Sequence, residues 1–257
     1  MVDWDDPSVD WSQFRAAIIR STWNYQDDPD AFLAWARRTA EQTRVLNPLD
    51  MVAWNIDKRY LLELALEGIP VIDTVFVATD AEAVGVELDG DVVVKPAVSA
   101  GSNDTARHRR EPTRALAHVR AILGSGRAAM VQPYDPDIDA LAETGVVCVG
   151  GAVSHAFAKS AILNGTPAAH NGLYVEETIE PRQPVDAELA LADTVLGFLR
   201  RRFGAPPAYA RIDMVGGALG RPRIMEVELI EPSLFLHLDE SAPERAALAF
   251  VAAARGK

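Results

Sequence analysis

Residues 209–234 read YARIDMVGGALGRPRIMEVELIEPSL, and they carry the strongest structural signal in the chain. Two apolar runs flank a glycine-rich turn, which predicts the two strands of a hairpin. Because side chains alternate along a strand, Arg211 and Asp213 share one face of the first strand. By the same rule, Glu226 and Glu228 share one face of the second. A guanidinium and three carboxylates can therefore meet on one face of this hairpin.

These carboxylates have apolar neighbours in the sequence, so water is expected to screen them poorly. They repel one another strongly unless a cation lies among them. The hairpin therefore predicts a magnesium site formed by Asp213, Glu226 and Glu228. The alternative is an exposed hairpin whose charges face solvent, and the apolar residues on either side of each charge argue against it.

The composition is that of an acidic chain with enough apolar residues for a sizeable core. Of 257 residues 49% are hydrophobic, and 25 basic against 37 acidic side chains give a net charge of −12. Nucleic acid is therefore a poor partner, because binding it needs a basic face. The lone Cys148 lies in an apolar run, which favours a buried, unreactive thiol and a reducing cytoplasm. No apolar run approaches the roughly 20 residues of a membrane span, and the acidic N-terminus does not resemble a signal peptide.

Strands and helices are mixed along the chain. Strands are expected at 16–20, 71–77, 92–95 and 129–132, and a second hairpin at 145–149 and 153–159. Helices are expected at 28–42, 55–67, 112–123, 186–203 and from about 243, and loops at 97–105 and 163–174. This mixture, with hairpins in the second half, favours α+β lobes over one doubly wound sheet.

Two lysines lie in contexts that suit phosphate binding. Lys95 ends a predicted strand and precedes the small-residue loop 97–105, AVSAGSNDT. Backbone N–H groups of such a loop can approach an anion closely. Taken alone, a solvated lysine at the end of a strand is the simpler interpretation of Lys95. Lys58, in the first turn of its predicted helix, taken alone indicates an exposed helix lysine.

The sequence Val131-Gln132-Pro133-Tyr134 follows another predicted strand. On its own it is a strand leaving its sheet. It is also typical of a hinge between two lobes, where adenine meets backbone donors and acceptors.

Together these motifs resemble the ATP-grasp superfamily, in the branch of glutathione synthetase, the RimK-type ligases and D-alanine–D-alanine ligase. The similarity runs from about residue 55 to the C-terminus. It rests on NIDKRYLLELALEGIPVIDT, VVVKPAVSAGS, MVQPYDPDI, TGVVCVGG, ARID and MEVELIEPS, in that order. The resemblance implies an α+β ATP-grasp fold, with two α/β lobes clamping ATP after a partial N-terminal α/β pre-ATP-grasp domain. The implied domains are 1–50, 51–132 and 133–257, and either the N-terminal domain is truncated or this member is short.

The resemblance also implies roles for individual residues. Those implied to bind nucleotide are Lys58, Lys95, Ser99, Gly101, Ser102, Gln132, Pro133 and Tyr134; the metal ligands are Asp213, Glu226 and Glu228; the catalytic residues are Arg211 and Lys159; the substrate contacts are His170, Asn171, Gly172, Glu231 and Ser233. The implied cofactors are ATP and two Mg²⁺ ions, with Mn²⁺ as an alternative. The family usually has asparagine where this chain has Glu228, so that ligand adds a negative charge here.

Within the superfamily, RSTWNYQDDPDAFLAWA and MEVELIEPSLF are most similar to the D-cycloserine synthetase group, which closes O-ureidoserine into a ring with ATP. The implied function is a cytoplasmic carbon–nitrogen ligase of antibiotic biosynthesis that activates a carboxylate as an acyl-phosphate. An intermolecular amino acid or peptide ligase, and a non-catalytic ATP-binding regulator, stay open as alternatives. The expected partner is a small amino-acid-like substrate, not nucleic acid or a membrane, and a homodimer is one arrangement left open.

Overall fold

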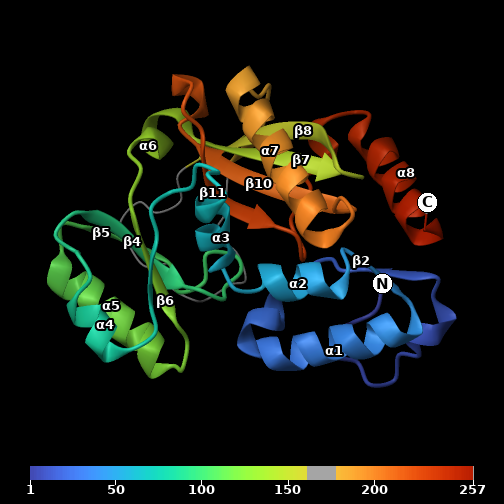
Figure 1. Ribbon diagram of the computed structural model, residues 1–257, viewed down its shortest axis with the longest axis horizontal. Coiled ribbons are helices and arrows are strands. Elements are labelled where there is room, and N and C mark those ends of the chain that lie inside the picture. Colours follow the sequence, from blue (N-terminus) through green and yellow to red (C-terminus); the bar gives the residue numbers. More distant parts are fainter. Residues whose placement is uncertain (161–177, 257) are drawn as a thin grey trace.

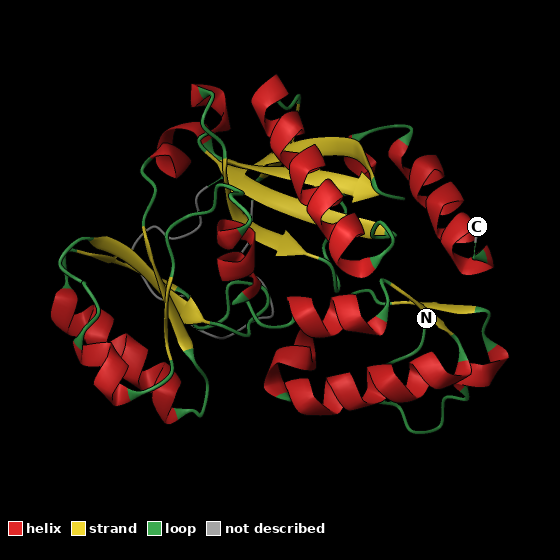
Figure 2. Ribbon diagram, viewed as in Figure 1, coloured by secondary structure: helices red, strands yellow, loops and turns green. Residues whose placement is uncertain are grey.

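The computed structural model describes residues 1–160 and 178–256. Its strands form three sheets, and each sheet belongs to one lobe (Figures 1 and 2). The N-terminal lobe contains β1 (Ala16–Ile18) and β2 (Arg44–Leu46), the central lobe contains β3 to β6, and the C-terminal lobe contains β7 to β11. The predicted loop at 163–174 lies outside the described residues.

The N-terminal lobe is a parallel strand pair packed against helix α1 (Pro29–Gln42). The side chain of Asp28 caps the helix by accepting a hydrogen bond from the Ala31 N–H at 2.9 Å. Pro29 fits the first turn, where no N–H is needed. The helix predicted at 28–42 is confirmed. Its buried face is aromatic, and the rings of Phe32 and Trp35 lie 5.2 Å apart.

Two short helices lead out of this lobe, α2 (Leu49–Asn55) and α3 (Tyr60–Leu66). The single helix predicted at 55–67 is therefore wrong at its start. The break has a tertiary cause, because the backbone N–H of Lys58 donates to the Ala97 carbonyl at 2.9 Å. Gly68 follows α3 with φ +76°, a conformation that glycine adopts without strain.

The strand predicted at 71–77 is also shorter than expected, since only β3 (Val75–Val77) joins the central sheet. Before that, the chain runs along the C-terminal lobe. Val71 forms an isolated bridge with Ile224, and the Ile72 N–H donates to the Ile224 carbonyl at 2.9 Å. The segment from Val71 to β3 therefore connects the C-terminal lobe to the central lobe, and its first residues do not extend the strand.

The central lobe is a four-stranded antiparallel sheet in the order β3-β6-β4-β5. Its other strands are β4 (Asp91–Pro96), β5 (Ala106–Arg109) and β6 (Ala129–Pro133). Helices α4 (Asp80–Val84) and α5 (Pro112–Gly124) cover one face of this sheet (Figure 2). The opposite face is left for contacts with the rest of the molecule.

The C-terminal lobe is a five-stranded antiparallel sheet in the order β11-β10-β7-β8-β9. The strands are β7 (Glu143–Val149), β8 (Ala152–Lys159), β9 (Ile179–Arg182), β10 (Tyr209–Val215) and β11 (Arg223–Glu228). Both predicted hairpins are confirmed, and Gly150 and Gly151 form the turn of one with φ +60° and +79°. The short helix α6 (Asp137–Leu141) precedes this sheet, α7 (Asp186–Phe203) crosses it, and α8 (Ala242–Arg255) ends the chain.

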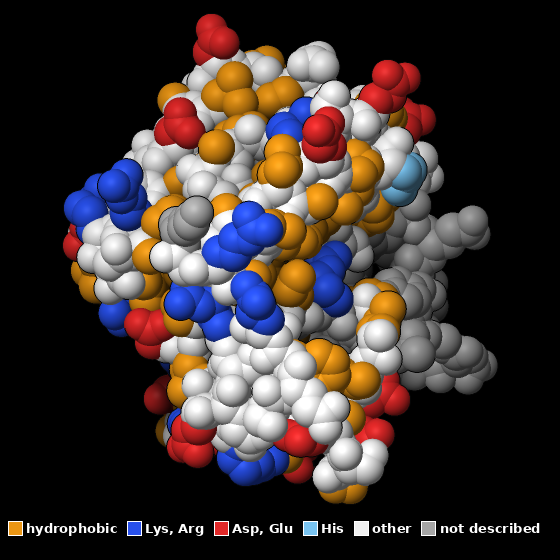
Figure 3. Space-filling view, turned by 90° about the vertical axis from the view of Figure 1, so that its right-hand side faces the viewer, with side chains coloured by type: hydrophobic (Ala, Val, Ile, Leu, Met, Phe, Trp, Pro, Cys, Tyr) orange, Lys and Arg blue, Asp and Glu red, His pale blue; other side chains and the backbone are white. Residues whose placement is uncertain are grey.

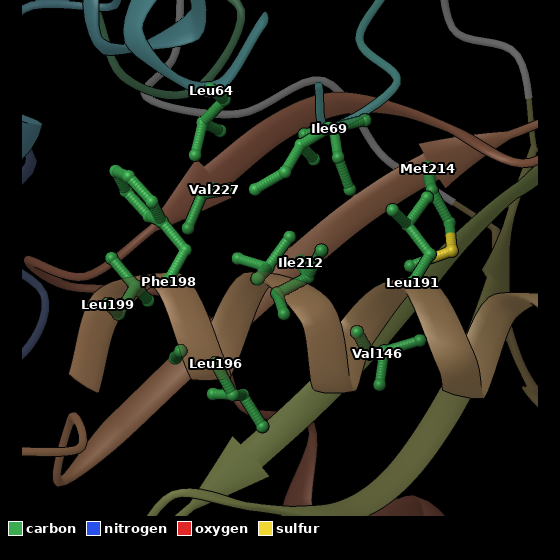
Figure 4. Close-up of a cluster of buried hydrophobic side chains, with 14 of the residues drawn as sticks. Leu64, Ile69, Val146, Leu191, Leu196, Phe198, Leu199, Ile212, Met214 and Val227 are labelled. Carbon is green, nitrogen blue, oxygen red and sulfur yellow. The ribbon is translucent and has the colours of Figure 1, made fainter. Parts of the chain in front are cut away.

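Helix α7 supplies the largest hydrophobic core (Figure 4). Leu191 and Leu199 point from α7 toward the sheet, where Ile212 lies in the middle of β10. Leu64 of α3 joins the same cluster from the other side of β11. The core therefore fixes the β10–β11 hairpin against both α7 and α3, and so fixes the positions of its charged residues.

Figure 3 looks onto the side of the molecule on which α8 lies. Apolar and basic side chains lie next to one another there, and Leu248 and Val251 of α8 are exposed. Among residues 1–160 and 178–256, no helix is both long and apolar enough to cross a membrane.

Candidate active site

A cavity of about 430 Å³ lies between the lobes and is lined by residues from all three of them. The structure brings together every predicted site residue that it describes: Lys58, Lys95, Ser99, Gly101, Ser102, Gln132, Pro133, Tyr134, Lys159, Arg211, Asp213, Glu226, Glu228, Glu231 and Ser233. The predicted substrate residues His170, Asn171 and Gly172 lie outside the described residues.

The β10–β11 hairpin contributes the charged side of this cavity. Arg211 is the register partner of Glu228, and Asp213 is that of Glu226, so the four side chains share one face as the alternation predicts. Arg211 binds Asp213 with two parallel hydrogen bonds, Nε to Oδ1 and Nη2 to Oδ2, each 2.8 Å long. Its Nη2 also contacts a carboxylate oxygen of Glu228.

Burial and charge act together on these groups. Burial alone would lower the pKa of Arg211, but Asp213 and Glu228 raise it well above its usual range. Burial raises the pKa of Glu228; Arg211 opposes this, whereas the charges of Asp213 and Glu226 add to it. Within the hairpin itself one guanidinium faces three carboxylates, and this local excess of negative charge suits a further cation.

The geometry indicates how such a cation could be held. In the parts of the chain that the structure describes, no three His, Cys, Asp or Glu side chains converge into a metal cage. Arg211 holds Asp213 and Glu228 instead, and Lys58 holds Glu226. Mg²⁺ commonly binds through one or two carboxylates and completes its shell with phosphate oxygens and water. The donor set fits Mg²⁺ bound together with a phosphate ligand.

Two buried lysines face the same cavity. The ammonium of Lys58 is bound by the Ser99 carbonyl at 2.7 Å and by Glu226 at 3.2 Å. Lys95 is 8% exposed, and within residues 1–160 and 178–256 its ammonium has no hydrogen-bond or ion-pair partner. Burial lowers the pKa of Lys95, and the charge of Glu226 partly restores it. A buried, unpaired ammonium on a cavity wall calls for an anionic ligand.

Residues 97–105 form a loop, as predicted, and this loop lies beside these lysines. Gly101 and Ser102 both adopt positive φ, at 60° and 59°. The loop is held at Ala97 by the Lys58 N–H and at Ala100 by Gln26, whose Oε1 accepts from the Ala100 N–H at 2.9 Å. Its position is therefore set by the N-terminal lobe and by the residues before α3.

The segment Gln132–Tyr134 connects the central and C-terminal lobes. The Gln132 amide donates to Thr74 at 2.9 Å, and the Tyr134 N–H donates to the Asp91 carbonyl at 2.7 Å. The Tyr134 ring stacks under the Arg107 guanidinium, 3.3 Å from its centroid. The chain then enters α6, which the sequence did not predict, because two prolines and three aspartates mask the helix.

The remaining predicted residues lie around the hairpin. Lys159 at the end of β8 pairs with Glu143 at 3.8 Å. Glu231 is buried, and burial raises the pKa of its carboxyl group. The Ser233 carbonyl accepts from Arg211 Nη1 at 3.4 Å.

Three residues of the N-terminal lobe were missed at the sequence level. Trp23 and Tyr25 line the cavity, and Gln26 holds the 97–105 loop. They lie in the stretch RSTWNYQ, which follows a predicted strand. Ligands often bind at the carboxyl ends of strands, so this position was the signal that could have identified them.

Known proteins are similar to this chain in sequence and in fold. A sequence model of the family described as "D-cycloserine synthetase DcsG, N-terminal domain" matches residues 1–47. The cycloserine biosynthesis protein DcsG of Streptomyces lavendulae is 35% identical, over 96% of this chain and 86% of that protein.

Solved structures of related proteins have a similar fold. The crystal structure of D-cycloserine synthetase DcsG matches with a TM-score of 0.87 at 34% identity, over 100% of this chain and 89% of that one. D-alanyl-alanine synthetase A from Vibrio cholerae matches with a TM-score of 0.65 at 16% identity, over 94% and 75% of the two chains. A RimK domain ATP-grasp protein from Sphaerobacter thermophilus matches with a TM-score of 0.60 at 19% identity, over 94% and 81%. The predicted ATP-grasp fold is confirmed.

Proposed function

The chain belongs to the D-cycloserine synthetase DcsG family of ATP-grasp ligases, and on that basis we propose that it closes the ring of O-ureidoserine in an ATP-dependent reaction. In the proposed reaction, the substrate carboxylate attacks the γ-phosphorus of ATP, and ADP leaves. A nitrogen of the same molecule then displaces phosphate from the acyl-phosphate and forms the carbon–nitrogen bond.

The observation that carries this proposal is the ammonium of Lys95, which has no partner among the described residues and shares one cavity with the hairpin carboxylates. A simple anion would satisfy Lys95 but would be repelled by Asp213, Glu226 and Glu228. A nucleoside triphosphate with divalent cations would satisfy both, because the lysines would bind the phosphates and the carboxylates would hold the cations.

The charges support the same ligand. Lys58, Lys95 and Arg211 balance Asp213, Glu226 and Glu228 in formal charge. ATP brings about four negative charges, which two Mg²⁺ ions balance. The filled site is then close to neutral, as a phosphoryl-transfer site closed to water requires. We propose Asp213, Glu226 and Glu228 as the ligands, with Mn²⁺ as an alternative ion. When bound, the ions neutralise the charge of the β- and γ-phosphates.

The nucleotide can be placed from the cavity walls. Lys58, Lys95 and the 97–105 loop, with Ser99, Gly101 and Ser102, would bind the phosphates. Gln132, Pro133 and Tyr134 would bind adenine at the hinge. Ile72 and Met225 also line the cavity and would supply apolar walls for the base.

Arg211 is the proposed catalytic cation. Asp213 and Glu228, which Arg211 now binds, would hold the magnesium, and the guanidinium would then stabilise the negative oxygen of the tetrahedral intermediate. Removing one such donor typically costs on the order of 10²–10³ in rate. Lys159 lines the same cavity and is proposed as the second catalytic residue. Glu231 and Ser233 also line it and are proposed to contact substrate. Roles for His170, Asn171 and Gly172 stay predictions.

ADP release over a panel of amino acids that includes O-ureidoserine tests this function. Release with O-ureidoserine alone, without an added amine, is the expected result and selects ring closure. Release that requires a second amino acid would select an intermolecular ligase. Nucleotide binding without ADP release under any of these conditions would select a regulator and overturn the proposal.

A further inference from the structure

Tyr25 reaches the cavity from the N-terminal lobe, in a position that the proposed function leaves without a role. It lies in a short 3-10 turn, Trp23–Asp27, that follows β1. Its side chain is 6% exposed, and its ring packs 5.2 Å from that of Phe32. The ring is therefore fixed in the core of the lobe, while the residue still lines the cavity.

The Tyr25 hydroxyl differs from those of two other buried tyrosines. The Tyr60 hydroxyl bonds both backbone groups of Val227, and the Tyr209 hydroxyl donates to the Ile230 carbonyl at 2.9 Å. Among the described residues, the Tyr25 hydroxyl has no such partner. It is also not one of the fully buried polar atoms that lack a hydrogen bond. Buried tyrosine hydroxyls normally find a partner. The partner of Tyr25 is therefore to be sought in the cavity.

Tyr25 lines the same cavity as the groups proposed to bind ATP and substrate. Burial, followed by the charges of Glu231 and Glu226, raises the pKa of Tyr25 well above its usual range. The phenol therefore keeps its proton and remains a donor. The next residue, Gln26, holds the 97–105 loop through Ala100. The residue next to Tyr25 thus contacts the loop assigned to the phosphates, and Tyr25 lines the same cavity as the carboxylates assigned to magnesium.

We propose that Tyr25 is a catalytic residue whose hydroxyl donates a hydrogen bond to the carboxyl group of the amino-acid-like substrate. This inference rests on the proposed function. A substrate carboxylate entering among three acidic side chains needs donors, and a neutral phenol supplies one without adding a charge that competes with magnesium. In the phosphoryl step a bond forms between the carboxyl oxygen and the γ-phosphorus, and the bond to the bridging oxygen of ADP breaks. Tyr25 keeps its proton throughout and holds the second carboxyl oxygen.

Tyr25→Phe tests the inference, because it removes the hydroxyl and keeps the ring that packs on Phe32. ADP release is measured with ATP and O-ureidoserine. We expect kcat/KM for O-ureidoserine to fall about tenfold or more, as for the loss of a hydrogen bond to a charged group. The KM for ATP should stay within about twofold of wild type. The Tm should not fall, because no hydrogen bond within the described part of the protein is lost. Tyr209→Phe is the matched control and should lower the Tm, since its hydroxyl is bonded inside the protein.

Wild-type kinetics in Tyr25→Phe would overturn the inference, and so would an equal rise in KM for ATP and for O-ureidoserine. A clear fall in Tm would show that the hydroxyl bonds within the protein, and would also reject it. If the wild-type chain releases no ADP with O-ureidoserine or with any amino acid, the proposed function fails and the inference fails with it. An active wild type with an unaffected variant rejects Tyr25 alone.

Discussion

Gln26 and Ala100 connect the N-terminal lobe to the 97–105 loop, because Gln26 Oε1 accepts a hydrogen bond from the Ala100 N–H at 2.9 Å. Val98 and Ala100 also pack against the apolar core of that lobe. The loop proposed to bind the phosphates is therefore supported by the lobe that carries Tyr25. We expect nucleotide binding to depend on contacts from a lobe that does not itself hold the nucleotide.

Gln26→Leu should raise the KM for ATP roughly fivefold, because it removes one ordinary hydrogen bond that orders the loop. The kcat should change little, since the variant touches neither the metal ligands nor Arg211. Steady-state kinetics with varied ATP measure both constants. Gln42→Leu, at the exposed end of α1, is the control and should leave the KM for ATP unchanged. Equal values for the two variants would show that the Gln26–Ala100 bond does not order the loop.

Asp213→Asn and Glu226→Gln should each abolish ADP release and leave the protein folded. Each keeps the shape of the side chain but removes the charge proposed to hold magnesium. Activity is measured over a range of Mg²⁺ concentrations, and folding by circular dichroism. Glu67→Gln, on the exposed surface after α3, should behave as wild type. Near-wild-type turnover in either test variant would mean that the metal assignment is wrong.

Gly217→Ala should lower the free energy of unfolding by about 1–3 kcal/mol, as overpacking typically does. A Cβ at this position would lie 2.0 Å from Oε1 of Glu188, whose carboxylate is fully buried and bonded to Thr144 at 2.6 Å. Urea unfolding measures the change. Gly90→Ala is the control, since a Cβ added there would meet no atom within 4 Å and the φ of Gly90 is ordinary. A Gly217→Ala variant as stable as the control would mean that Glu188 can move aside.

The sequence was most informative where the cause of a structure is local. The helix at Pro29–Gln42 begins at a capping aspartate followed by proline, and the hairpin register follows from alternation alone. The helix expected at 55–67 was wrong because its break depends on Ala97, which is distant in sequence. Lys95 resembles an ordinary solvated lysine in the sequence, because its burial comes from lobe packing that the sequence does not show.

The site was predicted best where its residues lie in compact motifs. Arg211, Asp213 and Glu226 follow one another within a single hairpin and could be chosen from the sequence. Tyr25 and Gln26 could not, because Gln26 bonds a loop more than 70 residues later in the chain and Tyr25 lines a cavity that all three lobes form. Only the folded structure shows that the Tyr25 hydroxyl lacks a partner among the described residues.

Stability should fall as the pH drops below about 6.5, in part because of a histidine pair in the central lobe. His108 Nε2 and His118 Nδ1 lie 3.1 Å apart, so one ring must donate and the other must accept. Burial lowers the pKa of both rings, and the charge of His108 lowers that of His118 further. The unfolded chain therefore binds protons first, near pH 6.5, and the folded state loses stability until its own lower pKa values are reached.

The free energy of unfolding, measured by urea titration between about pH 8 and pH 5, should follow this dependence. The double variant His108→Gln/His118→Gln can keep a hydrogen bond between two amides but cannot titrate. Its slope against pH below about 6.5 should be smaller than that of wild type. His237→Gln removes an exposed imidazole and should keep the wild-type slope. If the double variant and His237→Gln show the same slope, the buried pair does not contribute to acid instability, and its two rings must accept protons as readily in the folded state as in the unfolded chain.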